Sequence, residues 1–439
     1  MSKKSSKFAR KFEKKDAMKI YRANILFTPT REEFTILEHG YVVVGDDGNV
    51  VETCQELPEK YAGVPVVDFG DQLLMPAMND LHVHAPQYRN LGIAMDMELL
   101  PWLNTYTFPE ESKYKDIRYA ERMYRRFVRD LWKLGTMRAA IFATIHPEAS
   151  CLLADLLQEA GLGGMVGLVG MDRNGPETLS NTVEEAVAGT KRVMEHTKSM
   201  PLVSAIVTPR FVPSCTPAMM TALGQLAKEY NLPVQSHLSE NQSEIAWVAE
   251  LEPESSCYGD AYLRYGMFGQ TPTLMAHCCY TDGEEFELMR KNHVFAVHCP
   301  TSNCNLGSGI APIRRFLEAG IPVALGSDVS GGSGFSIFRV MHYTLQMAKM
   351  QWVRTDHKDQ FLSLSEAFWL ATKSGGSFFG KVGSFEPGYA FDALVVDDSD
   401  LNFDNYTIQH RLERYIYLGD DRQLTHRFCQ GREIPAPKI

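Results

Sequence analysis

Short apolar runs alternate with longer segments of helical period through most of the chain, from about Pro76 to Gly380. Residues 118–135 and 217–230 are examples of the helical segments. This alternation is typical of βα units that build a parallel sheet. Eight strand-like runs can be distinguished, at residues 74–84, 137–143, 165–172, 203–211, 232–238, 273–278, 294–300 and 321–328. An α/β fold with a closed, TIM-type (β/α)8 barrel is therefore predicted.

An open, doubly wound sheet is the alternative arrangement for this α/β region. Such a sheet would need a Gly-rich phosphate-binding loop near its start, and the sequence contains none there. The closed barrel is therefore the favoured interpretation.

Both ends of the chain have β character instead. Residues 20–29, 40–45 and 64–70 are rich in β-branched and aromatic residues and are separated by turn signals, which predicts a small antiparallel unit. Segments with the same β character recur after Gly383. Neither end is large enough to stand alone, so together they are expected to form a β-sandwich beside the barrel. The predicted divisions are a basic tail at 1–18, the first part of the sandwich at 19–75, the barrel at 76–382 and the second part of the sandwich at 383–439.

The overall composition excludes some partners. The formal net charge is −10, whereas nonspecific nucleic-acid binding needs a basic surface. No run of 18 apolar residues is present, so no membrane span is predicted, and the basic start lacks the apolar segment of a secretory signal. The 9 Cys include no C-x-x-C pair, which favours the reducing cytoplasm.

Several strand-like runs end in residues that bind metals. In a strand, side chains two residues apart face the same side, so one ion could contact a pair such as His82 and His84. A single residue of this kind would be interpreted as a core histidine or a helix cap. Five at the ends of strands, which meet at the active-site face of a barrel, predict a metal site instead. The five are His82, His84, His237, His277 and Asp328.

Three imidazoles and a carboxylate suit zinc, and also iron or manganese. A catalytic metal lowers the pKa of a bound water, which is what a hydrolase needs. A second metal in such barrels commonly needs a bridging lysine on a middle strand, and the runs at 165–172 and 203–211 contain none. One metal per chain is therefore expected.

Glu240 follows His237 closely, where the strand is ending. As an isolated residue it could equally be an acid in the first turn of the next helix. Beside a metal-binding histidine, the favoured role is that of a proton carrier with a pKa raised by a dry pocket. The role of His298 stays open, and the sequence His146-Pro147-Glu148 is discounted because the P-C-x-x-C part of that zinc signature is absent.

At this point the chain resembles the amidohydrolase superfamily. The resemblance is carried by HVH at 82–84, by His237, His277 and Asp328, and by the tail sequence at 384–396. Within the superfamily it is most similar to the guanine deaminases, and this narrower resemblance covers nearly the whole chain apart from the basic head. The specific stretches are residues 84–88, 99–111, 142–150, 207–211, 235–241, 275–280, 298–303 and 326–332.

The resemblance implies roles for these residues. One Zn²⁺, with Fe²⁺ as the alternative, would be held by a set of four ligands: His82, His84, His237 and Asp328. His277 would orient the attacking water, Glu240 would move protons, and Asp328 would share the catalytic work. The substrate would be contacted by Gln87, Arg210, Phe211 and His237. Ala77 stands where the family more often has glycine, which should shift a turn and leave the chemistry unchanged.

The predicted recognition residues also have a physical rationale. Arg210 presents a rigid fork of donors that suits a carbonyl oxygen and the adjacent ring nitrogen. Gln87 offers both a donor and an acceptor, and Phe211 could stack on a flat ring. The alternatives are a salt bridge from Arg210 to a helix and simple core packing of Phe211.

The function implied by the resemblance is the zinc-dependent deamination of guanine to xanthine and ammonia, in purine catabolism or salvage. The substrate would be a small purine base, and the chain would form a homodimer. The first alternative is a sister enzyme that acts on another heterocycle, such as 8-oxoguanine, cytosine or a triazine. The second is a catalytically dead scaffold, which the presence of every expected metal ligand disfavours.

Overall fold

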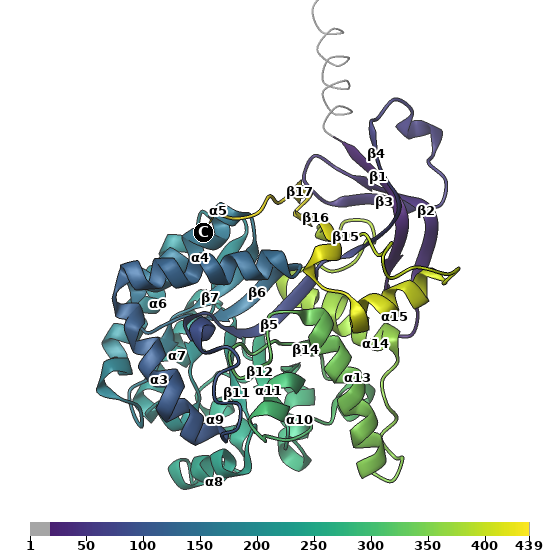
Figure 1. Cartoon of the computed structure of the whole chain (residues 1–439). Coiled ribbons are helices and arrows are strands. Elements are labelled where there is room, and N and C mark those ends of the chain that lie inside the picture. Colours follow the sequence, from purple (N-terminus) through teal and green to yellow (C-terminus); the bar gives the residue numbers. More distant parts are fainter. Residues whose placement is uncertain (1–17, 439) are drawn as a thin grey trace, which may run out of the picture.

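A computed structural model describes residues 18–438, so the predicted basic tail lies almost entirely outside the described residues. The larger part of the fold is a set of parallel strands surrounded by helices (Figure 1). Each of the eight predicted runs contains a strand, and two of them are interrupted. These strands are β5 Met78–His84, β6 Thr136–Phe142, β7 Gly163–Gly167 with β8 Val169–Gly170, β9 Val203–Ala205 with β10 Thr208–Pro209, β11 Val234–Leu238, β12 Thr273–His277, β13 Phe295–His298 and β14 Val323–Leu325.

The strands pair in three parallel ladders, β5-β6-β7-β9, β11-β12-β13-β14 and β8-β10. Backbone contacts connect the two larger ladders. Gln235 N donates to Val207 O at 3.0 Å, and Asp328 N donates to His82 O at 2.8 Å. The α/β class with parallel strands is thus confirmed, while a single closed barrel stays a prediction because the ladders are separate.

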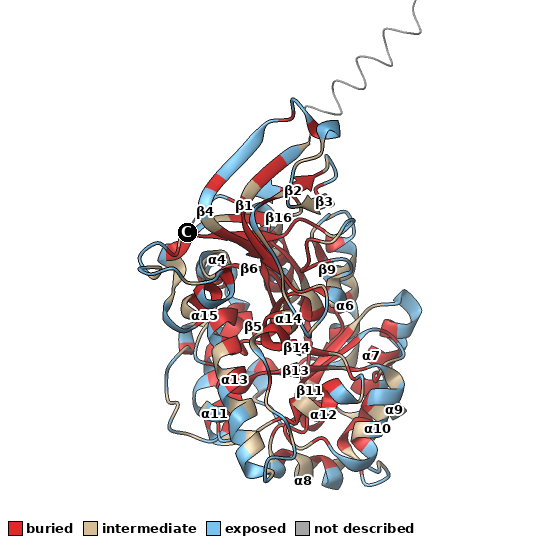
Figure 2. Ribbon diagram, turned by 90° about the vertical axis from the view of Figure 1, so that its right-hand side faces the viewer, coloured by how far each residue is buried: buried red, intermediate tan, exposed pale blue. Residues whose placement is uncertain are grey.

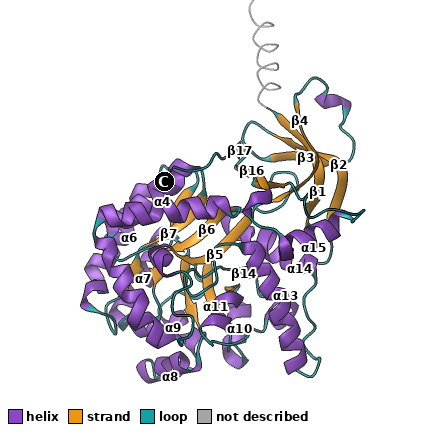
Figure 3. Ribbon diagram, in the orientation of Figure 1, coloured by secondary structure: helices purple, strands orange, loops and turns teal. Residues whose placement is uncertain are grey.

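Helices cover the outer side of these strands, with buried inner faces and exposed outer faces (Figures 2 and 3). The predicted helices at 118–135 and 217–230 are confirmed as α4 and α7. The helices of this region are α2 Leu99–Trp102, α3 Phe108–Glu111, α4 Ile117–Lys133, α5 Pro147–Ala160, α6 Val183–Thr197, α7 Pro217–Tyr230, α8 Gln242–Leu251, α9 Tyr258–Arg264, α10 Gly283–Asn292, α11 Pro300–Asn305, α12 Ile313–Glu318, α13 Ile337–Arg354 and α14 Leu364–Trp369.

Helix α4 illustrates why these segments are helical. The side chain of Asp116 accepts a hydrogen bond from Arg118 N and so caps the first turn. The buried residues of α4 recur every three or four positions, at 120, 123, 124, 127, 128 and 131. This spacing produces one apolar stripe, which packs against the strands.

Strands from both ends of the chain combine, as predicted, but in one seven-stranded sheet rather than in the two sheets of a sandwich, with the order β17-β16-β15-β4-β1-β2-β3. Its strands are β1 Lys19–Phe27, β2 Thr35–Val44, β3 Val50–Cys54, β4 Val66–Pro76, β15 Ala393–Val396, β16 Leu424–Cys429 and β17 Arg432–Glu433. Most pairs are antiparallel, but β1 pairs with β4 in parallel, because residues 55–65 carry the chain across to the far edge of β1. The C-terminal part also contains helix α15 Ile408–Leu418, which was not expected.

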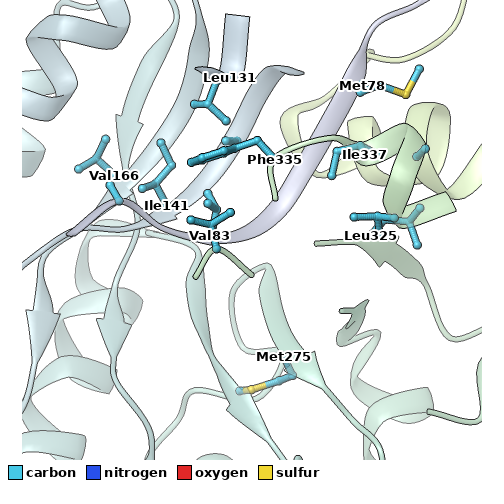
Figure 4. Packing of buried hydrophobic residues seen from close by; sticks show 14 of the residues in the cluster. Met78, Val83, Leu131, Ile141, Val166, Met275, Leu325, Phe335 and Ile337 are labelled. Carbon is cyan, nitrogen blue, oxygen red and sulfur yellow. The ribbon is translucent and has the colours of Figure 1, made fainter. Parts of the chain in front are cut away.

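The main core lies between the strands and their covering helices. Val83, Ile141 and Val166 on the strands lie near Leu131 of α4 and the buried Phe335 (Figure 4). This apolar layer occupies the outer side of the strands. Their carboxyl ends are thereby left for polar side chains. No helix within residues 18–438 is long and apolar enough to cross a membrane.

A buried ion pair connects β6 to the residue just before β15 of the seven-stranded sheet. Arg138 on β6 donates from Nε to Asp392 Oδ2 at 2.5 Å, and Asp392 also accepts from Gln430 N at 2.7 Å. Replacing Arg138 with Met would leave the Asp392 carboxylate buried without its cation. We expect a loss of about 3–5 kcal/mol in the free energy of unfolding, measured by urea denaturation.

The exposed pair Arg22–Asp68 provides the control, since Arg22→Met breaks a solvated ion pair and should change stability little. Equal stability of Arg138→Met and the unmodified chain would contradict a structural role for the buried pair.

Candidate active site

The two histidines of β5 meet at one point. As the period of a strand predicts, both side chains face the same side, and their Nε2 atoms lie 3.2 Å apart. His237, at the end of β11, brings its Nε2 to 3.3 Å from that of His84. Asp328, just beyond β14, places Oδ1 at 3.3 Å from His82 Nε2 and 3.4 Å from His84 Nε2.

The hydrogen bonding of His237 shows which way its lone pair points. Its Nδ1 lies 2.6 Å from the carbonyl oxygen of Arg210, which can only accept, so Nδ1 carries the proton. Nε2 is then a bare lone pair directed at His84. Burial lowers the pKa of His82, His84 and His237, and this favours the neutral, ligating form of all three imidazoles. Lone pairs converging on a carboxylate in this way fit a bound divalent cation.

The surroundings of Asp328 favour its ionised form. Burial opposes the ionisation of Asp328, but its interactions with His82, His277 and His84 hold the pKa of the carboxyl below the usual range. Its backbone adopts the left-handed conformation, with φ of 47°, which is uncommon for a residue other than glycine. Such backbone conformations persist where the surrounding structure holds them, often at functional sites.

His277 and Glu240 lie on the other side of the same centre. His277 Nε2 is 3.4 Å from Glu240 Oε2, and its Nδ1 is 2.9 Å from Asn303 Oδ1. The second oxygen of Glu240 accepts a hydrogen bond from Ser308 Oγ at 2.8 Å. Burial raises the pKa of Glu240, so this carboxyl can hold a proton at a higher pH than an exposed glutamate.

One cavity joins these groups, with an empty volume of about 430 Å³. Every predicted site residue lines it except His82, which lies behind the others. Its apolar wall comes from the segment of residues 99–111, identified above by resemblance. The cavity is lined by His84, Gln87, Leu99, Trp102, Leu103, Arg210, Phe211, His237, Glu240, Glu244, His277, Leu306 and Asp328.

The predicted recognition residues are held in place by other protein groups. Gln87 Oε1 accepts from Ser330 N at 3.1 Å, and Gln87 Nε2 donates to Glu111 Oε1 at 2.9 Å. Arg210 makes a salt bridge to Glu111 of helix α3, with Nη1 2.6 Å from Oε2. The alternative considered for Arg210, a salt bridge to a helix, therefore exists together with its position in the cavity wall.

Phe211 lies at the rim of the histidine cluster. Its ring meets that of His237 edge-on at a centroid distance of 6.4 Å and that of Trp247 at 6.3 Å. Phe211 and Trp102 thus contribute aromatic side chains to the cavity wall.

The residues left open or discounted in the sequence lie elsewhere. His298 is buried and lines a separate small pocket with residues of α12 and α13. His146 lines a surface pocket with Glu148 and Arg192. Cys278, Cys279 and Cys299 are buried and free, whereas Cys304 is free and exposed, so the interpretation of these four cysteines as core residues is wrong for Cys304.

Sequence reasoning missed the residues that hold the others in position. Asp80 accepts from Ser327 N at 2.9 Å and from His82 N at 3.2 Å, so it ties β5 to the segment that carries Asp328. Burial raises the pKa of Asp80 to about 7. Asp80 lies two residues before His82, so the period of the strand could have indicated it. Glu111 lies in the stretch 99–111 that carries the resemblance, but no local period indicated its partners.

Comparisons with known proteins agree with this geometry. The profile of the Amidohydrolase family matches residues 73–434. Guanine deaminase from Dictyostelium discoideum is 40% identical over 379 residues, which are 84% of each chain. The human guanine deaminase is 35% identical over 83% of each chain.

A solved structure of guanine deaminase from C. acetobutylicum, with bound guanine in its active site, is 50% identical. It superposes with a TM-score of 0.94, covering 95% of this chain and 100% of that one. A triazine hydrolase from Arthobacter aurescens is 16% identical with a TM-score of 0.84, covering 96% of this chain and 95% of the other, so that likeness concerns the fold alone. The chain therefore belongs to the amidohydrolase family.

Proposed function

We propose that this chain catalyses the hydrolytic deamination of guanine to xanthine and ammonia. The observation that carries the proposal is that one cavity is lined both by three of the four proposed metal ligands, His84, His237 and Asp328, and by the two polar residues suited to a purine edge, Gln87 and Arg210. The similarity to guanine deaminases, one of them with guanine bound, supports the choice of substrate.

One Zn²⁺, with Fe²⁺ as the alternative, would be held by His82, His84, His237 and Asp328. When bound, the metal would supply Lewis acidity, lowering the pKa of a water so that hydroxide forms near neutral pH. The cavity lining includes no lysine that could bridge a second ion, which supports one metal per chain.

The chain's own residues would move the protons. His277, whose Nδ1 is engaged with Asn303, would orient the attacking water through Nε2. Asp328 would take a proton from that water as its oxygen bonds to the amino-bearing carbon. Glu240 would donate its proton to the ring nitrogen beside that carbon.

Collapse of this adduct would release ammonia. The proton on Asp328 would pass to the amino nitrogen as the C–N bond breaks. Glu240 would take the proton from the new hydroxyl, leaving the carbonyl of xanthine and a Glu240 carboxyl ready for the next cycle. Gln87, Arg210, Phe211 and His237 would hold the base in place.

The architecture proposed from the sequence is supported by the backbone contacts between ladders. The Val207–Val234 bridge and the bond from Asp328 N to His82 O lie where a barrel of eight parallel strands would close. We also propose the division into parts at 19–75, 76–382 and 383–439, a homodimer, a cytoplasmic location and a role in purine catabolism.

A panel of substrates tests the proposed reaction. Guanine, 8-oxoguanine, cytosine, adenine and ammeline would be supplied to the zinc-loaded protein, and ammonia release would be measured. Guanine should have the highest kcat/KM, because the donor-rich pair of Arg210 and Gln87 suits a purine carbonyl. If guanine is inert while another heterocycle reacts, the chain is a sister amidohydrolase.

A further inference from the structure

The segment of residues 99–111 does more than close the cavity. Leu99, Trp102 and Leu103 line the cavity directly. Phe108 lies under Arg210, with the guanidinium carbon 5.0 Å from the ring centroid. Glu111, at the end of the segment, lies behind the lining residues and is 3% exposed.

Glu111 contacts both predicted recognition residues at once. Its Oε1 accepts from Gln87 Nε2 at 2.9 Å and from Arg210 Nη2 at 3.1 Å, while its Oε2 accepts from Arg210 Nη1 at 2.6 Å. The bidentate contact locks the plane of the guanidinium. Ser330 N donates to the other end of the Gln87 amide, so the orientation of that amide is also determined.

We propose that Glu111 is a positioning residue for substrate recognition, which fixes Arg210 and Gln87 as one rigid unit and cancels the charge of Arg210. A guanidinium has five N–H groups, and two of those on Arg210 bond to Glu111. The other three make no hydrogen bond to Glu111. This inference rests on the proposed function, because it assigns a role within the same site.

The charge of Glu111 has a consequence for selectivity. Arg210 alone would attract anions, whereas the buried ion pair presents hydrogen-bond donors with little net charge. A neutral 6-oxopurine would then be preferred over an anionic oxypurine. Urate, which is an anion at neutral pH, is the probe for this preference.

Glu111→Gln tests the proposal, since the amide keeps the shape but loses the charge and turns one end into a donor. We expect kcat/KM for guanine to fall on the order of 100-fold through misplacement of the recognition pair. Loss of the negative charge should also favour binding of the urate anion relative to guanine. The ratio of the urate inhibition constant to the KM of guanine should therefore fall about tenfold or more. Glu111→Asp keeps the charge and should retain the original urate selectivity even where its kcat/KM is lower.

Glu110→Gln is the matched control. Glu110 is the neighbouring acid, equally buried, but its partners are Lys113, Arg89 and Tyr119 rather than the recognition pair. It should change neither kcat/KM for guanine nor the urate ratio appreciably, and a change equal to that of Glu111→Gln would show a merely structural effect.

A double-mutant cycle with Arg210→Gln identifies the route of action. If Glu111 acts largely through Arg210, Glu111→Gln should lower kcat/KM clearly less in the Arg210→Gln variant than in the native chain, with the remaining loss due to its contact with Gln87. Additive losses would overturn the proposal. Where Glu111→Gln alone folds poorly, Glu111→Asp takes its place in the same cycle, and the same smaller loss in the Arg210→Gln variant is expected.

The two failures can be told apart. A wild-type protein inert toward guanine contradicts the proposed function. A wild-type protein that is active, with Glu111→Gln equal to it in both measurements, contradicts only the role of Glu111.

Discussion

Glu240→Gln should lower kcat for guanine by about 10²–10⁴-fold, the range typical for loss of a general acid–base group. The amide has nearly the same shape and can still accept from Ser308 Oγ, which lies 2.8 Å from Oε1. It cannot carry a proton to the ring nitrogen or take one back. Since burial raises the pKa of Glu240, the native carboxyl is suited to both tasks.

The variant should otherwise resemble the native protein. Metal content per chain should be unchanged, because Glu240 belongs to neither group of side chains that could hold the ion. Binding of guanine, measured by calorimetry, should change little. A rate close to that of the unmodified chain would rule out Glu240 as the proton carrier.

Removal of the metal should abolish turnover. The site has three converging imidazole nitrogens, with Nε2 separations of 3.2 and 3.3 Å, and the nearby carboxylate of Asp328. After dialysis against a chelator, we expect activity to fall by at least about 10³-fold and to return as Zn²⁺ is added back, reaching its maximum at one ion per chain. Metal analysis by mass spectrometry would give the ratio.

His237→Ala provides the matched variant for this experiment. It removes one ligand nitrogen while the rest of the cluster stays, so zinc should restore activity poorly even in excess. A maximum at two ions per chain would contradict the single-metal interpretation. Full activity in the metal-free protein would contradict the proposed mechanism altogether.

The sequence indicated the elements that carry the site. Each of the eight runs between residues 74 and 328 contains a strand, and the helices at 118–135 and 217–230 are present, because apolar periodicity reports directly on local structure. The same reasoning brought His82 and His84 to one side of β5. The positions of the runs also predicted that His237, His277 and Asp328 follow or end strands. Because the carboxyl ends of parallel strands lie at one edge of the sheet, these residues come close together.

Only the tertiary structure decided how these residues are held. Glu111 and Arg210 are 99 positions apart, and Asp80 and Ser327 are 247 apart, so no local pattern couples them. The parallel pairing of β1 with β4 depends likewise on the path of the connecting chain. Strand periodicity sets which face a side chain occupies, and therefore the sequence alone predicted that His82 and His84 lie on one side of their strand. The partner of a buried charge is set by packing between distant elements, and therefore the structure was needed to show that Glu111 joins Arg210 and Gln87.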